Sequence, residues 1–172
     1  MTKPKLYLMC GISGSGKTTF AKRFAEENGL YYLCPDDFYR MFNGDDRIHK
    51  NEFEIWMALF RALHMAEQQG RDTIFDTNNP THVSRLQLLD WFPGFEPHLI
   101  YIEAKPELCM ANNRSRRRVI PQEEMERMIS AFEAPSVYER WKYQSITIYK
   151  NDNNHLIKLE SQVDSYGLCS TD

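Results

Sequence analysis

The sequence predicts one α/β domain, with a mostly parallel sheet of about five strands and helices on both of its faces. Short apolar runs alternate with amphipathic stretches along the chain, and the first run leads into a glycine-rich segment. The length of 172 residues suits a single domain over residues 1–172. Hydrophobic residues make up 42% and charged residues 26%, as is ordinary for a globular protein.

The apolar runs mark five expected strands and a small edge strand. The five strands cover residues 5–10, 30–34, 73–75, 98–102 and 145–149, and the edge strand covers residues 156–159. Residues after Asn151 are mainly polar, and residues 160–172 are expected to form a polar tail.

Apolar residues at helical spacing predict the intervening helices. These cover residues 17–27, 52–69, 83–91, 106–113 and 121–132. In the longest helix, a stripe of large apolar side chains is expected to face the core. This stripe comprises Phe53, Trp56, Met57, Phe60, Leu63 and Met65.

Charge and cysteine usage narrow the class of protein. The net charge of −3 argues against a protein that coats long nucleic acids, although it permits binding to a strand end. The cysteines Cys10, Cys34, Cys109 and Cys169 lack C-x-x-C spacing, which disfavours a zinc site or disulfide framework; the first three are expected to be buried. The apolar run before Gly11 is too short for a signal peptide or a membrane span. We therefore expect a cytoplasmic protein without a membrane partner.

The glycine-rich segment contains a complete phosphate-binding motif. Residues 11–18 read Gly11-Ile12-Ser13-Gly14-Ser15-Gly16-Lys17-Thr18, which satisfies G-x-x-x-x-G-K-[ST] between an expected strand and helix. Glycines let the backbone N–H groups point at phosphate oxygens, and the following helix adds its positive dipole end. We therefore expect the three-layer P-loop NTPase fold, with ATP and Mg²⁺ as cofactors.

Within that loop, Lys17 is expected to bridge the β- and γ-phosphates, and the Thr18 hydroxyl to bind Mg²⁺. Thr19 completes the expected nucleotide-binding set. The same loop serves kinases, ATPases and GTPases. A GTPase is disfavoured because no Asn-Lys-x-Asp segment follows a late strand.

Two acids, Asp36 and Asp37, follow the second expected strand, at the end where doubly wound folds bind ligands. A carboxylate there can accept the proton of an acceptor hydroxyl during phosphoryl transfer. Each acid could instead cap the following helix. We favour the catalytic role for Asp36 and the capping role for Asp37.

The third expected strand delivers another acid in Ile74-Phe75-Asp76-Thr77-Asn78, which resembles a Walker-B segment. Asp76, Thr77 and Asn78 are expected to hold the acceptor, or an arginine across the cleft. The alternative is a turn closed by an Asx hydrogen bond.

Four arginines lie within five residues, at positions 114, 116, 117 and 118. Guanidinium groups match phosphate oxygens, so residues 114–121 are expected to form a lid over the phosphates. The alternative is a solvated charged face, and helical spacing leaves one or two of the four arginines on the surface in either case.

These residues resemble the phage-type polynucleotide 5′-hydroxyl kinases and related small AAA-type and zeta-toxin-like P-loop kinases. The resemblance covers about residues 5–135 and rests on the loop, Asp36, the segment from Phe75 to Asn78, and the lid ending in Val119-Ile120-Pro121. It implies Asp36 as general base and Asp76–Asn78 as part of the acceptor pocket. It also implies a lid arginine on the donor phosphates, best matched by Arg116, with Arg118 close behind.

One family feature is displaced in this sequence. The family carries an arginine three residues after its catalytic acid, where it grips an acceptor phosphate. Tyr39 occupies that place if Asp36 is the acid, whereas Arg40 fits only if Asp37 is the base. Asp37, Tyr39 and Arg40 are accordingly expected on the acceptor side.

The leading hypothesis is a kinase that transfers the ATP γ-phosphate to a hydroxyl, with a polynucleotide 5′ end as the favoured acceptor. A small-molecule, nucleobase or nucleotide-sugar kinase is the alternative within the class. An ATPase or nucleotide switch acting on a protein partner is the alternative outside it.

Overall fold

The computed structural model describes residues 2–159. The strands are β1 (Lys5–Cys10), β2 (Tyr31–Leu33), β3 (Thr73–Phe75), β4 (Glu96–Ala104), β5 (Ser145–Asp152) and β6 (His155–Leu159). The helices are α1 (Lys17–Asn28), α2 (Pro35–Asn43), α3 (Glu52–Gln68), α4 (His82–Trp91), α5 (Pro106–Arg114) and α6 (Gln122–Ser130), with a short 3₁₀ helix, η1 (Arg140–Lys142).

The sheet confirms the predicted α/β class. Its strand order is β2-β3-β1-β4-β5-β6. Every neighbouring pair is parallel except β5 and β6, which are antiparallel. The sixth strand is the edge strand expected near residues 156–159. Residues 160–172, with the expected polar tail and Cys169, lie outside the described residues.

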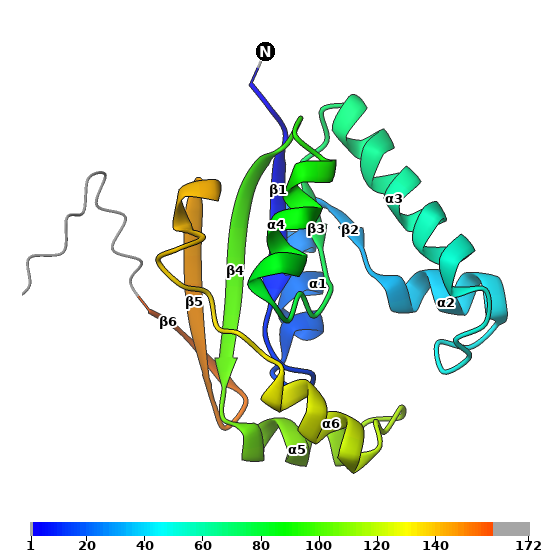
Figure 1. The fold of residues 1–172 in the computed structure, drawn as a ribbon, viewed down its shortest axis with the longest axis vertical. Helices are drawn as coiled ribbons and strands as arrows, with labels where there is room; N and C mark the ends of the chain where they lie inside the picture. The colour runs from blue at the N-terminus through cyan, green and yellow to red at the C-terminus, as the bar shows by residue number, and fades with distance from the viewer. Residues whose placement is uncertain (1, 160–172) are drawn as a thin grey trace, which may run out of the picture.

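Helices cover both faces of the sheet because alternate strand residues are apolar on both sides (Figure 1). On one face, Leu6 and Leu8 of β1 pack in a core with Leu59 of α3 and Leu88 of α4. On the other face, Met9 and its strand neighbours pack against α1.

Helix α1 buries Phe20, Ala21 and Ala25 against the sheet, and Phe24 packs against them. Cys10, Cys34 and Cys109 are buried free thiols, as expected.

The expected inner face of α3 is partly wrong. Phe53 is 74% exposed, and Met57 and Met65 are also exposed. The helix instead buries Ile55, Leu59, Leu63 and Ala66, while Trp56 and Phe60 are partly buried beside the core. Apolar residues occur around most of this helix, so spacing alone did not determine which stripe meets the sheet.

The topology brings the sequence motifs together. Parallel strands β2, β3 and β1 are neighbours, so the segments that follow them emerge at one edge of the sheet. These segments are α2 with its two acids, the Asp76–Asn78 turn and the phosphate-binding loop. Figure 1 shows α5 and α6 lying across this same carboxyl end. In residues 2–159, no helix is both long and apolar enough to span a bilayer.

Candidate active site

Three glycines shape the loop. Gly11, Gly14 and Gly16 have φ values of 144°, 90° and 99°, which side chains other than glycine rarely adopt. A Cβ atom on Gly11 would lie 2.6 Å from the carbonyl oxygen of Ile102, and one on Gly14 would lie 2.4 Å from that of Cys109. The loop therefore packs directly on the backbone of β4 and α5, and only glycine fits at both contacts.

Asparagines from distant segments hold the loop in place. Asn112 on α5 donates a hydrogen bond to the carbonyl oxygen of Gly14 at 2.9 Å, and Asn151 on β5 donates to that of Ser15 at 2.7 Å. Asn79, whose φ is 43°, donates to Met9 just before the loop at 2.8 Å. The sequence interpretation missed all three.

Lys17 lies inside the loop. Its Nζ donates to the carbonyl oxygens of Gly11 at 2.8 Å and Ile12 at 2.9 Å, and the residue is 5% exposed. Burial lowers the pKa of Lys17 to about 8, against the opposing effect of the Asp76 carboxylate, and the Arg116 charge lowers it further. Arg116 is the member of the arginine cluster whose charge contributes to this shift.

The loop has the features needed to hold a triphosphate. Besides the glycine contacts and Lys17, the Ser15 hydroxyl is buried without a hydrogen-bond partner among the described residues. Thr18 and Thr19 open the helix and are exposed. No cluster of three or more His, Cys, Asp or Glu side chains suited to a metal occurs in residues 2–159. The Thr18 hydroxyl is the group that would hold Mg²⁺ together with phosphate oxygens, as in other P-loop proteins.

The two acids at the start of α2 have different partners. Asp36 is half-exposed and accepts a hydrogen bond from Arg118 at 3.0 Å, and Arg118 also contacts His49. Asp37 instead pairs with Arg40 at 2.9 Å. Neither side chain caps α2, because its N-cap is Cys34 and no side-chain cap bond forms. The capping expectation for Asp37 is therefore wrong.

Tyr39 and Arg40 are both held by contacts with neighbouring side chains. Tyr39 is 3% exposed and stacks on His49 with the ring centroids 4.3 Å apart. Burial, reinforced by the Glu52 carboxylate, raises the pKa of Tyr39. Arg40 pairs with Asp46 at 2.8 Å as well as with Asp37, so two carboxylates already neutralise its charge.

The segment after β3 lies beside the loop. Asp76 is 4% exposed and accepts a hydrogen bond from the Tyr32 hydroxyl at 2.8 Å. Asn78 accepts a weak hydrogen bond of 3.4 Å from Ser13 in the loop. The Thr77 hydroxyl is buried and has no hydrogen-bond partner in the part of the chain that the structure describes.

Three of the four clustered arginines are exposed, more than the one or two that helical spacing predicted, because α5 ends at Arg114 and residues 115–118 do not continue the helix. Arg114 ends α5 and, like Arg116 and Arg117, is exposed. Arg117 approaches Asp45 at 3.8 Å. Among residues 2–159, Arg118 is the one member of the cluster with a close ion pair across the site, to Asp36.

A buried ionic network supports the segment after Asn79. Arg85 on α4 is fully buried and binds Glu139 at 2.7 Å, and it donates to the carbonyl oxygens of Asn79 at 2.9 Å and Glu133 at 3.0 Å. His82 also contacts Glu139, at 2.7 Å. This network was not predicted, since an arginine within a helix is usually exposed.

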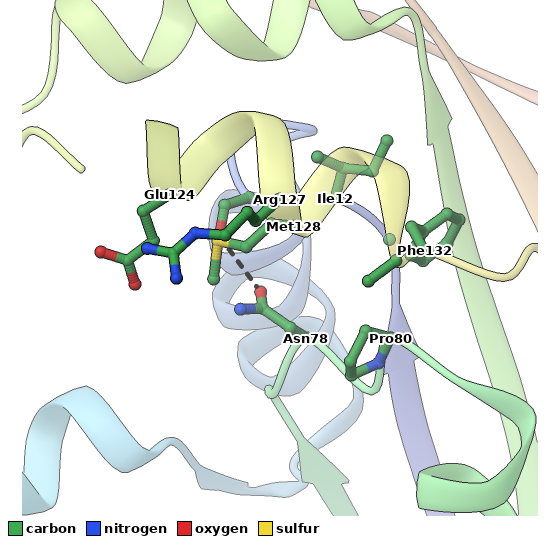
Figure 2. Close-up of a pocket in the computed structure, with 10 residues that line it drawn as sticks. Ile12, Asn78, Pro80, Glu124, Arg127, Met128 and Phe132 are labelled. Carbon is green, nitrogen blue, oxygen red and sulfur yellow. Dashed lines mark hydrogen bonds between the residues drawn. The ribbon is translucent and has the colours of Figure 1, made fainter. Parts of the chain in front are cut away.

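A pocket of about 320 Å³ adjoins the first half of the loop. It lies between the loop, the Asn78–Pro80 turn and α6 (Figure 2). In Figure 2, Asn78 and Pro80 lie on one side, and Met128 and Phe132 on the other.

A family model described as an AAA domain matches residues 6–135, which is most of the chain. The chain belongs to this AAA domain family. The match spans the loop, Asp36, the Asp76–Asn78 segment and the lid arginines, so every expected site residue lies within the family region. The expected membership of a small AAA-type P-loop family is confirmed.

Solved structures with a similar fold include a sugar kinase, a gluconokinase and a chain of an RNA repair complex. A sugar kinase from Janibacter sp. HTCC2649 has a TM-score of 0.63 at 20% identity, over 86% of this chain and 85% of that one. A gluconokinase from Sinorhizobium meliloti 1021 has a TM-score of 0.58 at 14% identity, over 86% and 82%. A chain of the Pnkp1/Rnl/Hen1 RNA repair complex has a TM-score of 0.70 at 18% identity, over 100% of this chain and 53% of that one.

These TM-scores show a shared fold, and at such low identities they do not identify the acceptor. No curated protein matches the chain.

Proposed function

We propose that the chain transfers the γ-phosphate of ATP to a hydroxyl group. The proposal rests on two features of the structure taken together. The phosphate-binding loop requires glycine at its close backbone contacts and encloses Lys17, and the Asp36–Arg118 pair joins α2 to the lid segment. The loop supplies the donor site. In the pair, Asp36 supplies the base, and Arg118 supplies a cation that phosphate binding can draw away from Asp36.

Asp36 accepts the proton of the acceptor hydroxyl. The freed oxygen bonds to the γ-phosphorus, and the bond from that phosphorus to the oxygen shared with the β-phosphate breaks, so that ADP leaves. Lys17 and Arg116 stabilise the charge of the transferring group, and Arg118 releases Asp36 when it turns to the phosphates. The Thr18 hydroxyl would hold Mg²⁺, which would supply charge neutralisation at the phosphates.

The favoured acceptor is a 5′-hydroxyl at the end of a polynucleotide. Support comes from the resemblance carried by Asp36 and the Asp76–Asn78 segment, and from a pocket beside the loop with room for about one nucleoside. A free strand end can reach such a pocket without a long basic groove.

A small-molecule kinase is the second candidate. Arg40, the residue available to grip an acceptor phosphate next to the base, is paired with Asp37 and Asp46. This local acidity favours an acceptor without a chain of phosphates. An ATPase or switch that borrows an arginine from a partner is less well supported, because this chain carries its own arginines in residues 114–118, close after α5.

The direct test is incubation of the full chain with γ-labelled ATP and Mg²⁺. The acceptors are 5′-hydroxyl oligonucleotides, a pool of nucleosides and sugars, or water alone, with Lys17→Ala as control. Label on an acceptor, absent with Lys17→Ala, supports the kinase proposal. Free phosphate alone, in the same amount with and without acceptors, would replace it with an ATPase.

A further inference from the structure

The pocket between the loop and α6 combines apolar walls with one free amide edge. Its apolar side chains are Ile12, Pro80, Met128, Ala131 and Phe132. Asn78 reaches it from the turn after β3 (Figure 2). The Asn78 carbonyl oxygen has only the weak bond from Ser13, and its amide nitrogen has no hydrogen-bond partner in residues 2–159.

This chemistry suits a flat heterocycle better than a free sugar. A sugar presents hydroxyls in many directions and requires polar partners on all sides, whereas most of the surface that lines this pocket is apolar. A nucleobase has apolar faces and an edge with adjacent donors and acceptors. Phenylalanine stacks on such faces, and the amide of an asparagine matches such an edge.

Charged side chains lie at the mouth. Arg127 and Glu124 project from α6 on the same side of the pocket in Figure 2. Neither has a salt bridge or side-chain hydrogen bond to another described residue. A phosphate attached to the sugar of a bound nucleoside would meet Arg127 there, while Glu124 disfavours a ligand with a larger negative charge.

The walls are tied together before any ligand binds. The backbone N–H of Glu133 donates to the carbonyl oxygen of Pro80 at 2.8 Å, which joins the segment after α6 to the turn. Arg85 donates hydrogen bonds to the carbonyl oxygens of both Asn79 and Glu133, and so links the same two segments. Hydrogen bonds therefore link the two walls of the pocket near Pro80 and Phe132, as is typical of a preformed site.

The position of the pocket along the phosphate-binding loop indicates which part of the donor it faces. Gly11, Ile12 and Ser13 form the first half of the loop, whereas its second half and the start of α1 are the parts that hold the α- and β-phosphates in P-loop proteins. The pocket therefore adjoins the γ-phosphate end of the donor.

We propose that this pocket binds the base of an acceptor nucleoside, with Phe132 and Asn78 recognising the ring and Arg127 a phosphate on the sugar. This inference rests on the proposed kinase function and names its acceptor class. The nucleoside is either a free nucleotide or the terminal residue of a strand.

Calorimetry on the full chain saturated with Mg-ADP tests the inference, because ADP fills the donor site. The probes are the four nucleosides, their 3′-monophosphates, a 5′-hydroxyl tetranucleotide, and glucose and gluconate. We expect a nucleoside to bind, and Asn78→Ala and Phe132→Leu each to weaken it about tenfold. Arg127→Ala removes the added affinity of the 3′-phosphate. The controls Phe53→Leu and Arg61→Ala, exposed on α3, change nothing.

The 5′-hydroxyl tetranucleotide shows whether the nucleoside is a free nucleotide or the end of a strand. A tetranucleotide that binds more tightly than every 3′-monophosphate identifies a strand end, and equal affinity identifies a free nucleotide. Binding of gluconate or glucose without nucleosides would overturn the inference, as would nucleoside affinity unchanged in Asn78→Ala and Phe132→Leu. Those results leave the kinase proposal standing if ADP binds. Failure of the folded chain to bind Mg-ADP or Mg-ATP overturns both proposals.

Discussion

Lys17 gives the site a pH dependence at the scale of one residue. Its pKa of about 8 lies below the ordinary lysine value of 10.5 because the ammonium is buried. At pH 8.5 the free protein therefore holds Lys17 mostly neutral, whereas bound phosphate favours the charged form. We predict that Mg-ADP binding at this pH takes up protons, measured by calorimetry in two buffers of different ionisation enthalpy. Binding without proton uptake would contradict the buried position of Lys17.

The same shift affects stability. Below pH 8 both the folded and unfolded chains hold the Lys17 proton, but between about pH 8 and 10.5 only the unfolded chain does. The contribution of Lys17 to the free energy of unfolding therefore rises with pH in this window. Lys17→Met lacks this contribution. We therefore expect the free energy of unfolding of wild type to rise relative to that of Lys17→Met between pH 8 and 10 in urea titrations.

Gly14 tests the contact between the loop and α5. Gly14 and Gly29 both have positive φ, but an added Cβ meets the Cys109 backbone at Gly14 and nothing within 4 Å at Gly29. Gly29→Ala should cost about 1 kcal/mol from backbone strain alone. Gly14→Ala should cost more, and should weaken ATP binding because the loop must shift. Equal unfolding free energies and ATP affinities for the two variants would rule out this close contact.

The sequence predicted the loop and Lys17 because their residues are consecutive and their spacing is fixed by phosphate geometry. It did not predict Asn79, Asn112 or Asn151, whose hydrogen bonds to the loop and to the residue before it span 70, 98 and 136 positions. A single asparagine has no periodic pattern, so only the folded backbone shows that it anchors a loop.

At the scale of elements, the Arg85–Glu139 pair joins α4 to the segment before η1. Both side chains are buried, so removing one leaves an unpaired charge in the interior. We predict that Arg85→Ala lowers the free energy of unfolding by about 3–5 kcal/mol in urea titrations. Arg23→Ala, which breaks the exposed Arg23–Glu27 pair, should change it by less than about 1 kcal/mol. Equal effects of the two variants would show that the buried pair contributes little.

Element positions were predicted better than element faces. The strands and helices follow the expected order because alternating apolar runs fix it. The inner face of α3 was wrong at Phe53, Met57 and Met65, because an apolar helix offers several stripes and the sheet selects one. Arg85 was missed because its partner Glu139 is 54 positions away.

At the scale of the whole molecule, the sheet brings the motifs to one edge. The strand order places β3 between β1 and β2, so the loop, Asp76 and Asp36 follow neighbouring strands. Alternation of strands and helices predicted this arrangement in outline. It could not predict the Asp36–Arg118 pair, because the lid position depends on how α5 and α6 cross the end of the sheet.

The most direct test of the central claim compares Asp36→Asn with wild type in single-turnover transfer from labelled ATP to the acceptor that takes label. Asp37→Asn serves as control. We predict that Asp36→Asn lowers the transfer rate by about 10²–10⁴-fold with ATP affinity nearly unchanged, because only the proton acceptor is lost. Asp37→Asn should transfer at close to the wild-type rate. Wild-type transfer by Asp36→Asn, or a large loss confined to Asp37→Asn, would contradict the assignment of Asp36 as the base.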